Sequence, residues 1–228
     1  LAETLSRVLY PDDSTPQGRE LRLKQEYFFT SASLQDLLRR YLSTHDDLTA
    51  LPDHAAIQLN DTHPALAVPE LMRLLMDMHG MKRKKAFDIT RRCISYTNHT
   101  LLPEALERWP LDMFRAVLPR HLQIIEKIDR SFVRELNSMD SAVKPEDVCA
   151  IDYHDGNGGS VRMGNLAFIG SHRVNGVSEL HTDLMAQTVV RDLHPVFPDR
   201  IVNMTNGVTP RRWLYNCNVA LSDLITEA

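Results

Sequence analysis

The alternation of short apolar segments with longer amphipathic ones is the feature that most constrains this fold. Four apolar segments, each four or five residues long, are expected to form β-strands. They cover residues 55–59, 93–96, 165–169 and 201–204. Between them, apolar side chains recur every three or four residues, as in a helix with one buried face. Strands that alternate with helices favour a parallel sheet, because each helix returns the chain to the edge where the previous strand began.

The predicted helices start and stop at residues that commonly bound a helix. A long helix begins near Gly18 and carries Leu34, Leu38 and Leu42 on one face. A second helix, which includes Leu71, ends before Gly80. The other expected helices cover residues 84–92, 103–106 and 119–136, a stretch from residue 177 to 188, and two short segments that begin at Pro210 and Asn218. Helical patterns therefore fill the intervals between the predicted strands.

A predicted β-hairpin interrupts this alternation. Residues 148–152 and 161–163 flank the segment Asp155-Gly156-Asn157-Gly158-Gly159, which is typical of a hairpin turn. These glycines lack the GxGxxG spacing of a dinucleotide-binding loop, so we expect no phosphate cradle there. The pattern as a whole predicts an α/β fold with a mainly parallel, doubly wound sheet and one hairpin insertion.

Charge and cysteine usage exclude several classes of protein. The 26 basic and 30 acidic residues give a net charge of −4, so no basic field attracts nucleic acid or anionic lipid. The apolar runs are too short to span a membrane. Cys93, Cys149 and Cys217 are odd in number and lack metal-binding spacing, which favours a reducing compartment. We therefore expect a cytoplasmic protein with no metal, nucleic-acid partner or membrane partner.

Polar residues follow all four predicted strands. In chain order they are Asn60, Asp61 and His63; Asn98 and His99; the segment 170–176; and Asn206. Any one set is explained by a simple turn, because Asn, Asp and Thr are common turn formers. Four such turns on one sheet indicate a ligand site, since parallel strands end at the same edge. Amide, hydroxyl and imidazole groups without a cluster of cations suit a neutral sugar better than a phosphate.

Two histidines have alternative interpretations. His99 follows a strand, with Glu107 eight residues further on, and such a pair serves either as a structural histidine beside a carboxylate or as an acid and a base. Spacing alone does not choose between these roles. His181 lies on a helical stripe with Leu180 and Leu184, and we expect it to be a buried core histidine.

Long blocks of sequence, in the same order, resemble the glycogen and maltodextrin phosphorylases over nearly the whole chain. Residues 10–28 resemble the active-site gate loop of that family and the helix after it, in a version, Asp12-Asp13-Ser14-Thr15, that is similar to the bacterial members. The other blocks are residues 58–64, 96–110, 119–125, 171–177 and 205–213. Segment 137–163 matches the family weakly.

The resemblance implies phosphorolysis of an α-1,4-glucan, in which inorganic phosphate takes the terminal glucosyl unit to give glucose 1-phosphate with retention. Pyridoxal phosphate is the implied cofactor and exchanges protons with the substrate phosphate through its own phosphate group. His99 is the implied catalytic residue and contacts the glucosyl unit near its anomeric carbon. The implied substrate-binding residues are Asn206, Asp61, His63, Glu107, Ala105 and Asp13, the last in the gate loop.

The resemblance also implies a place for this chain in a two-domain, Rossmann-like glycosyltransferase of the GT-B type. Residues 1–228 would be one partial domain, the C-terminal part of the N-terminal domain, and the cofactor lysine would lie in a second domain outside this chain. We expect a homodimer for the full-length protein, and self-association without catalysis for the isolated chain. A non-catalytic carbohydrate-binding module is the alternative; a Rossmann oxidoreductase would require a GxGxxG after the first strand, which is missing.

Overall fold

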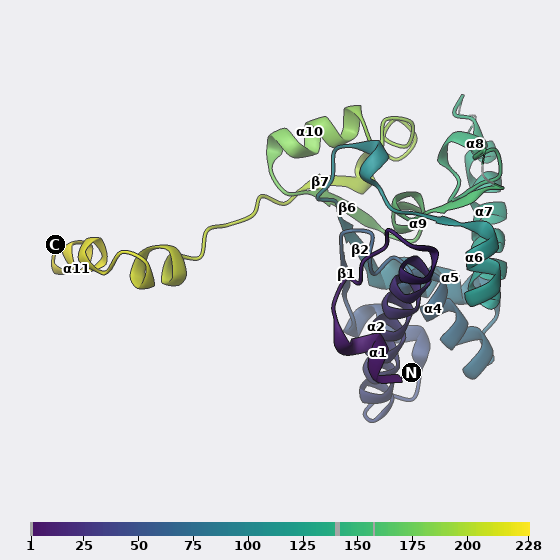
Figure 1. Ribbon diagram of the computed structural model, residues 1–228, viewed down its shortest axis with the longest axis horizontal. Helices are drawn as coiled ribbons and strands as arrows, with labels where there is room; N and C mark the ends of the chain where they lie inside the picture. The colour runs from purple at the N-terminus through teal and green to yellow at the C-terminus, as the bar shows by residue number, and fades with distance from the viewer. Residues whose placement is uncertain (1, 140–141, 157) are drawn as a thin grey trace.

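A parallel β-sheet lies at the centre of the computed structural model, which describes residues 2–139, 142–156 and 158–228 (Figure 1). Its strands, in spatial order, are β1 (Ile57–Asn60), β2 (Ile94–Thr97), β6 (Arg173–Gly176) and β7 (Ile201–Asn203). Each neighbouring pair is parallel, with Ile57 opposite Ile94 in the first pair. The predicted α/β fold with a parallel sheet is confirmed. The described strands run in one order across the sheet without a reversal, so the doubly wound arrangement stays a prediction.

Helices pack around this sheet, and Figure 1 shows α4, α5, α7 and α9 together on one side of it. The α-helices are α1 (Ala2–Arg7), α2 (Pro16–Leu42), α3 (Leu51–His54), α4 (Ala67–Arg73), α5 (Arg83–Cys93), α6 (Leu111–Val117), α7 (Pro119–Ser138), α8 (Pro145–Val148), α9 (Met163–Ile169), α10 (Glu179–Gln187) and α11 (Val219–Glu227). The 3-10 helices are η1 (Leu48–Ala50), η3 (Pro103–Ala105) and η4 (Pro198–Arg200), and the π-helices are η2 (Leu74–Met78) and η5 (Arg211–Asn216).

Helix α2 begins at a well-formed N-terminal cap. The Thr15 hydroxyl accepts a hydrogen bond from the Gly18 amide at 3.1 Å, and Pro16 occupies the first turn, where its missing N–H costs nothing. Position 18 must be glycine, because a Cβ there would lie 1.8 Å from the Asp12 carbonyl oxygen. The loop before the helix is therefore folded tightly back on its first turn, as the sequence predicts for a helix that starts near this glycine.

A buried ion-pair network fixes α2 against α4 and α7. The fully buried Glu70 carboxylate accepts from the Ser31 hydroxyl at 2.6 Å, from Arg73 at 2.7 and 2.8 Å, and lies 2.7 Å from His121 Nε2. Burial alone raises the pKa of Glu70, but the hydrogen bonds from Arg73, His121 and Ser31 outweigh it and bring the pKa to about 2. The position of α2 relative to the sheet is thus set by charge-assisted bonds in the core.

A small antiparallel sheet confirms the predicted hairpin and extends it. Strands β4 (Ile151–Asp152) and β5 (Ser160–Arg162) form the hairpin, and β3 (Arg108–Pro110), which sequence patterns did not predict, pairs with the free side of β5. Gly159 has a φ of +92°, and a Cβ there would lie 2.6 Å from a Leu111 methyl carbon. Asn157, in the predicted turn, lies outside the described residues.

The predicted strand at 165–169 is wrong, because these residues belong to helix α9. Leu166, Ala167, Phe168 and Ile169 are all almost completely buried. A short apolar segment without periodicity is compatible with either a buried strand or a buried helix. The sequence pattern therefore could not predict which of the two forms here. The segment after it, predicted to be a polar turn, contains strand β6.

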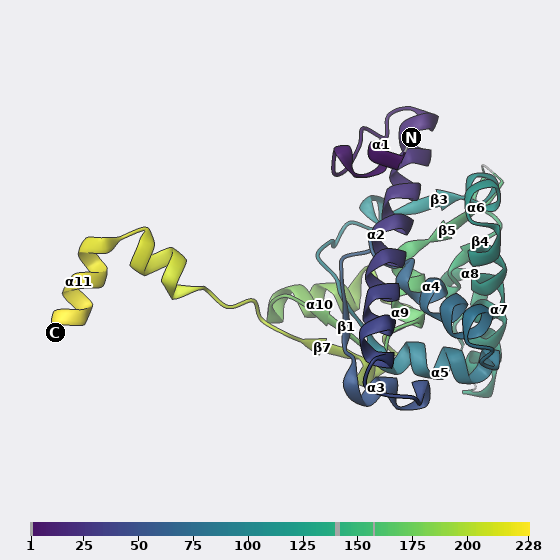
Figure 2. The same cartoon turned by 90° about the horizontal axis from the view of Figure 1, so that it is seen from below.

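Helix α10 is more exposed than predicted, and the segment beyond β7 is largely exposed. Leu180 and Leu184, expected to face the core, are 70% and 37% exposed, and Met185 is the buried residue of the helix. His181 is half-buried, so its predicted role as a core histidine is wrong. Figures 1 and 2 show the chain after β7 running away from the body of the molecule, with η5 and α11 at its far end.

Candidate active site

Four polar residues meet at the carboxyl edge of the parallel sheet and are called the strand-end cluster: Asn60, His99, His181 and Asn206. His99 Nε2 lies 2.5 Å from Asn60 Oδ1, which joins the ends of β1 and β2. His181 is close enough to His99 that, after burial, the charge of His99 is the second cause that lowers its pKa. The main-chain N–H of Asn206 donates to the Val177 carbonyl oxygen at 2.9 Å, and the main-chain N–H of Val177 donates to His181 Nδ1 at 3.3 Å.

Three of the four side chains of this cluster are exposed to water, and the fourth, His181, is half-buried. His99 and Asn206 are exposed, and the Asn206 side chain has no hydrogen-bond partner among the described residues. Because the Asn60 carbonyl oxygen accepts, His99 Nε2 carries a hydrogen, which leaves Nδ1 as an acceptor in the neutral imidazole. The edge therefore presents amide and imidazole groups with free donors and acceptors and little charge, as the sequence indicated.

Two residues with left-handed backbone lie beside the cluster. Among the described non-glycine residues, only Tyr10 (φ 55°) and Asp61 (φ 68°) have positive φ. Asp61 turns the chain at the end of β1, and its carboxylate accepts from the Thr62 amide at 2.6 Å. The turn brings His63 to the loop before α2, where its Nδ1 lies 3.2 Å from the Tyr10 hydroxyl and the two rings meet edge to face. Unfavourable backbone of this kind gathers at functional sites.

Arg22 of α2 joins three acidic residues into what we call the carboxylate cluster: Asp13, Arg22, Glu26 and Glu107. Its guanidinium lies 2.6 Å from Asp13, 3.5 Å from Glu26 and 3.3 Å from Glu107. The side chains of Glu26 and Glu107 are 7% and 10% exposed, whereas that of Asp13 is 51% exposed. One cation thus serves three carboxyl groups, two of which are nearly buried.

The charge balance of this cluster requires a proton. The carboxyl oxygens of Glu26 and Glu107 are buried without a hydrogen-bond donor of good geometry, which is costly if both groups are ionised. Burial and then the charge of Glu107 raise the pKa of Glu26 to about 10. A protonated Glu26 supplies the missing donor toward Glu107. The cluster therefore carries a neutral Glu26 beside Glu107, and one guanidinium shared among three acidic residues.

Of the seven predicted site residues, His99 and Asn206 lie in the strand-end cluster, and Asp13 and Glu107 lie in the carboxylate cluster. Asp61 and His63 lie beside these clusters. Ala105 is the exception: it is exposed in η3, and no described contact joins it to the others. Arg22 and Glu26 were missed, although they lie four residues apart on one helix face. Their partner Glu107 is far away in the chain, so no local pattern reveals the contact.

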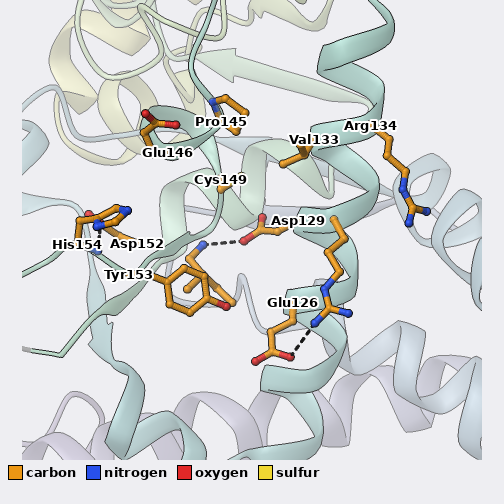
Figure 3. Close-up of a pocket in the computed structure, with 12 residues that line it drawn as sticks. Glu126, Asp129, Val133, Arg134, Pro145, Glu146, Cys149, Asp152, Tyr153 and His154 are labelled. Atoms are coloured by element: carbon orange, nitrogen blue, oxygen red, sulfur yellow. Dashed lines mark hydrogen bonds and ion pairs between the residues drawn. The ribbon is translucent and has the colours of Figure 1, made fainter.

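A separate hollow of about 440 Å³ lies between α7 and the hairpin, and none of the predicted site residues lines it (Figure 3). Asp129 points from α7 toward the chain at the start of β4 (Figure 3). Its carboxylate accepts hydrogen bonds from the Ala150 and Ile151 amides at 2.8 Å each. Burial raises the pKa of Asp129 to about 6 in spite of these bonds. Asp129 therefore has a structural role, which is to tie the hairpin to α7.

Comparison with known sequences assigns the chain to a family. The model of the Phosphorylase family, described as carbohydrate phosphorylase, matches residues 1–228, so the chain belongs to the carbohydrate phosphorylases. Over 225 residues it is 52% identical to a glycogen phosphorylase of Haemophilus influenzae. It is 47% identical over 227 residues to a glycogen phosphorylase of Chlamydia pneumoniae, and 46% identical over 239 residues to the muscle form of glycogen phosphorylase of Homo sapiens.

These matches cover almost all of this chain but only part of each relative. They span 99% or 100% of the chain, yet 27% of the Haemophilus protein and 28% of the other two. Across the described residues, no helix is both long and apolar enough to cross a membrane. The same residues contain no group of three or more His, Cys, Asp or Glu side chains arranged to hold a metal ion.

Proposed function

We propose that this chain is the sugar-binding face of a longer α-glucan phosphorylase, which transfers a terminal α-1,4-linked glucosyl unit to inorganic phosphate and releases glucose 1-phosphate. One observation carries the proposal. The ends of β1, β2 and β7 bring Asn60, His99 and Asn206 to one edge, and the loop before α2 folds toward that edge. A phosphorylase needs such a neutral surface for sugar hydroxyls beside a movable gate.

The strand-end cluster is suited to holding the donor sugar. His99 Nε2 is fixed by Asn60, so its Nδ1 and main-chain carbonyl are free to face a ligand. The side-chain amide of Asn206 has free donor and acceptor atoms for a sugar hydroxyl. In our proposal these groups orient the glucosyl unit, and a fixed carbonyl dipole at His99 favours positive charge at the anomeric carbon as the glycosidic bond breaks.

The carboxylate cluster gives the gate a point of attachment. Asp13 lies in the gate loop, and Arg22 connects it to Glu107, which is held in the wall of the site by burial. A carboxylate at Glu107, paired with Arg22, favours a transition state with oxocarbenium character. We therefore assign Glu107 an electrostatic role, and Asp13, Asp61, His63 and Ala105 positions along the site.

The implied pyridoxal phosphate does not fit the residues of this chain. Its six lysines lie in α2, α5 and α7 or directly before α5 and α8: Lys24, Lys82, Lys84, Lys85, Lys127 and Lys144. None of them lies at the carboxyl edge of the sheet. We infer that a second, Rossmann-like domain of the GT-B type supplies the cofactor lysine, that the full-length protein is a cytoplasmic homodimer, and that the isolated chain self-associates without catalysis. The comparisons lend no support to the alternative of a carbohydrate-binding module.

The test is phosphate-dependent release of glucose 1-phosphate from an α-1,4-glucan by the full-length protein. With His99→Asn, we expect kcat to fall about 100-fold, as when one preorganised polar group is lost, with a smaller change in KM and an unchanged pH profile. His79→Asn, at an exposed position after η2, is the matched control and should retain full activity. A limb of the pH profile that disappears only in the His99 variant would assign proton transfer to the imidazole instead.

A further inference from the structure

Arginines converge at the opposite, amino-terminal edge of the parallel sheet. Arg91 lies near the end of α5, just before β2; Arg173 begins β6; and Arg200 ends η4, directly before β7. Parallel strands start at one edge, so the three guanidinium groups meet where three neighbouring strands begin. They line a hollow of about 310 Å³, called the amino-edge hollow, whose lining is Arg91, His172, Arg173, Val196, Phe197, Pro198, Asp199 and Arg200.

Two of these three cations lack a neutralising partner. Arg91 forms a two-pronged ion pair with Glu135, with both N–O distances at 3.0 Å. Arg173 makes one described side-chain hydrogen bond, to the His172 carbonyl oxygen at 3.2 Å. Arg200 makes no ion pair with a described residue, and neither does Asp199, the single carboxylate in the lining. The hollow therefore has an excess of positive charge.

Arg200 is a buried arginine that forms no ion pair with a described carboxylate, although Glu135, the partner of Arg91, is near enough to raise its pKa. It is 7% exposed, and its guanidinium stacks over the Phe197 ring at 4.2 Å and the Phe168 ring at 5.1 Å. Its remaining contact is a long hydrogen bond of 3.4 Å to the Phe168 carbonyl oxygen. Burial, followed by repulsion from Arg91, lowers the pKa of Arg200 to about 10. The attraction of a bound anion would offset both the burial and the repulsion.

Stacking on Phe168 and Phe197 allows the Arg200 guanidinium to remain charged beside the hollow. Aromatic rings hold the faces of the guanidinium and leave its N–H edge free, and that edge matches the oxygens of a phosphate or a carboxylate. A purely structural arginine would need neither a hollow beside it nor two further guanidinium groups at its side. We propose that the amino-edge hollow binds a small phosphate-bearing anion, at a site separate from the glucan site across the sheet.

The test is calorimetric titration of the full-length protein, without glucan, first with inorganic phosphate and then with glycerol 1-phosphate. Arg173→Glu reverses the charge of an exposed side chain, and Arg200→Met removes a buried charge while keeping an apolar stem against the rings. We expect each variant to lose one phosphate per chain from the wild-type stoichiometry, or to bind it at least about ten-fold more weakly. The matched control is Arg92→Gln, which removes an exposed arginine that pairs with Asp53 and lies outside the hollow lining.

The two probes distinguish the sources of the phosphoryl group. Tighter binding of inorganic phosphate assigns the site to the free ion, and tighter binding of glycerol 1-phosphate assigns it to a phosphate ester. Identical stoichiometry and affinity in wild type and Arg173→Glu would overturn the proposal, whether or not Arg200→Met folds. The readout is binding, so it stands independently of the phosphorolysis assay, in which Arg173→Glu should retain its full rate.

Discussion

The carboxylate cluster and the strand-end cluster lie in the same candidate site but are built in opposite ways. In the first, Glu26 and Glu107 are nearly buried, and Arg22 bridges three acidic groups. In the second, His99 and Asn206 are exposed, and their polar atoms are largely free. A buried group must find its partners within the fold, whereas an exposed group can exchange water for a ligand at small cost.

This difference in burial suggests that the two clusters have different roles in the site. In the carboxylate cluster, one guanidinium and one proton serve the two nearly buried carboxyl groups, so this cluster acts as a fixed wall of the site. The strand-end cluster keeps its donors and acceptors available, so it is the part that contacts the sugar in our proposal. Substitutions in the wall should therefore change stability, and substitutions at the strand ends should change catalysis alone.

The largest effect is expected for Arg22→Met. The change leaves the buried Glu107 charge without its cation, and removing one partner of a buried pair costs about 3 kcal/mol. This cost should lower the Tm of the full-length protein, measured by calorimetry, by a few degrees. Arg19→Met, an exposed arginine three residues earlier on α2, is the control and should leave Tm unchanged. An unchanged Tm for Arg22→Met would show that the carboxyl groups of Glu26 and Glu107 are in contact with water in the folded protein.

Asn206→Ala should reduce catalysis and leave stability unchanged, which is the reverse of the effect expected for Arg22→Met. Losing one hydrogen bond to a sugar hydroxyl costs about 1–3 kcal/mol, which corresponds to a ten- to hundred-fold loss of kcat/KM at about 1.4 kcal/mol per decade. Because Asn206 is exposed, Tm should not change. The measurement is steady-state phosphorolysis, with the exposed Asn216→Ala of η5 as the control. Wild-type kinetics in the Asn206 variant would reduce this residue to a turn former.

Glu26→Gln tests the proton of the carboxylate cluster through the pH dependence of stability. Glu26 stays protonated in the folded protein up to a pKa of about 10, against an ordinary value of 4.5 when unfolded. Its contribution is therefore complete below pH 4.5 and is lost as the pH rises toward 10, by up to about 1.4 kcal/mol per pH unit. Glutamine mimics the neutral acid, so the variant should lose this slope in urea unfolding between pH 6 and pH 9, an interval of about 3 units. Parallel slopes for variant and wild type would mean that Glu26 is ionised.

The smallest effect is expected for Tyr10→Phe, at the contact between His63 and the carboxylate cluster. The hydroxyl lies 3.2 Å from His63 Nδ1 in an exposed place, where one hydrogen bond contributes about 0.5 kcal/mol. The ring remains against His63 and Arg22, so kcat/KM should fall only about two-fold. A loss of ten-fold or more would show that the hydroxyl itself contacts the substrate.

Local patterns predicted most of the fold. Strands β1, β2 and β7, the hairpin, and the helices α2, α5 and α7 all occur where the sequence placed them, because each has a clear period or a well-marked boundary. Helix α9 was predicted as a strand, since an apolar run buried on every side has no period to read. The exposed face of α10 was predicted to be buried, because Leu180 and Leu184 recur at helical spacing whether or not anything covers them.

The neutral half of the site was also predictable, in part, from the sequence. Asn60, His99 and Asn206 each follow a strand, and the rule that parallel strands end at one edge is enough to bring them together. The charged half was not predictable in this way. Arg22 and Glu107 lie 85 positions apart in the chain, and their contact depends on how α2 packs beside the segment before β3.

The sequence by itself therefore determined most of the strands and helices, though not β3, β6 or α9, and the neutral character of the strand ends, because periodicity and turn chemistry act over a few residues. Only the tertiary structure decided that Arg22 serves three carboxyl groups, that Glu26 holds a proton, and that arginines gather at the opposite edge of the sheet. Burial sets the cost of a charge, and burial depends on every element that packs nearby. No local pattern contains that information.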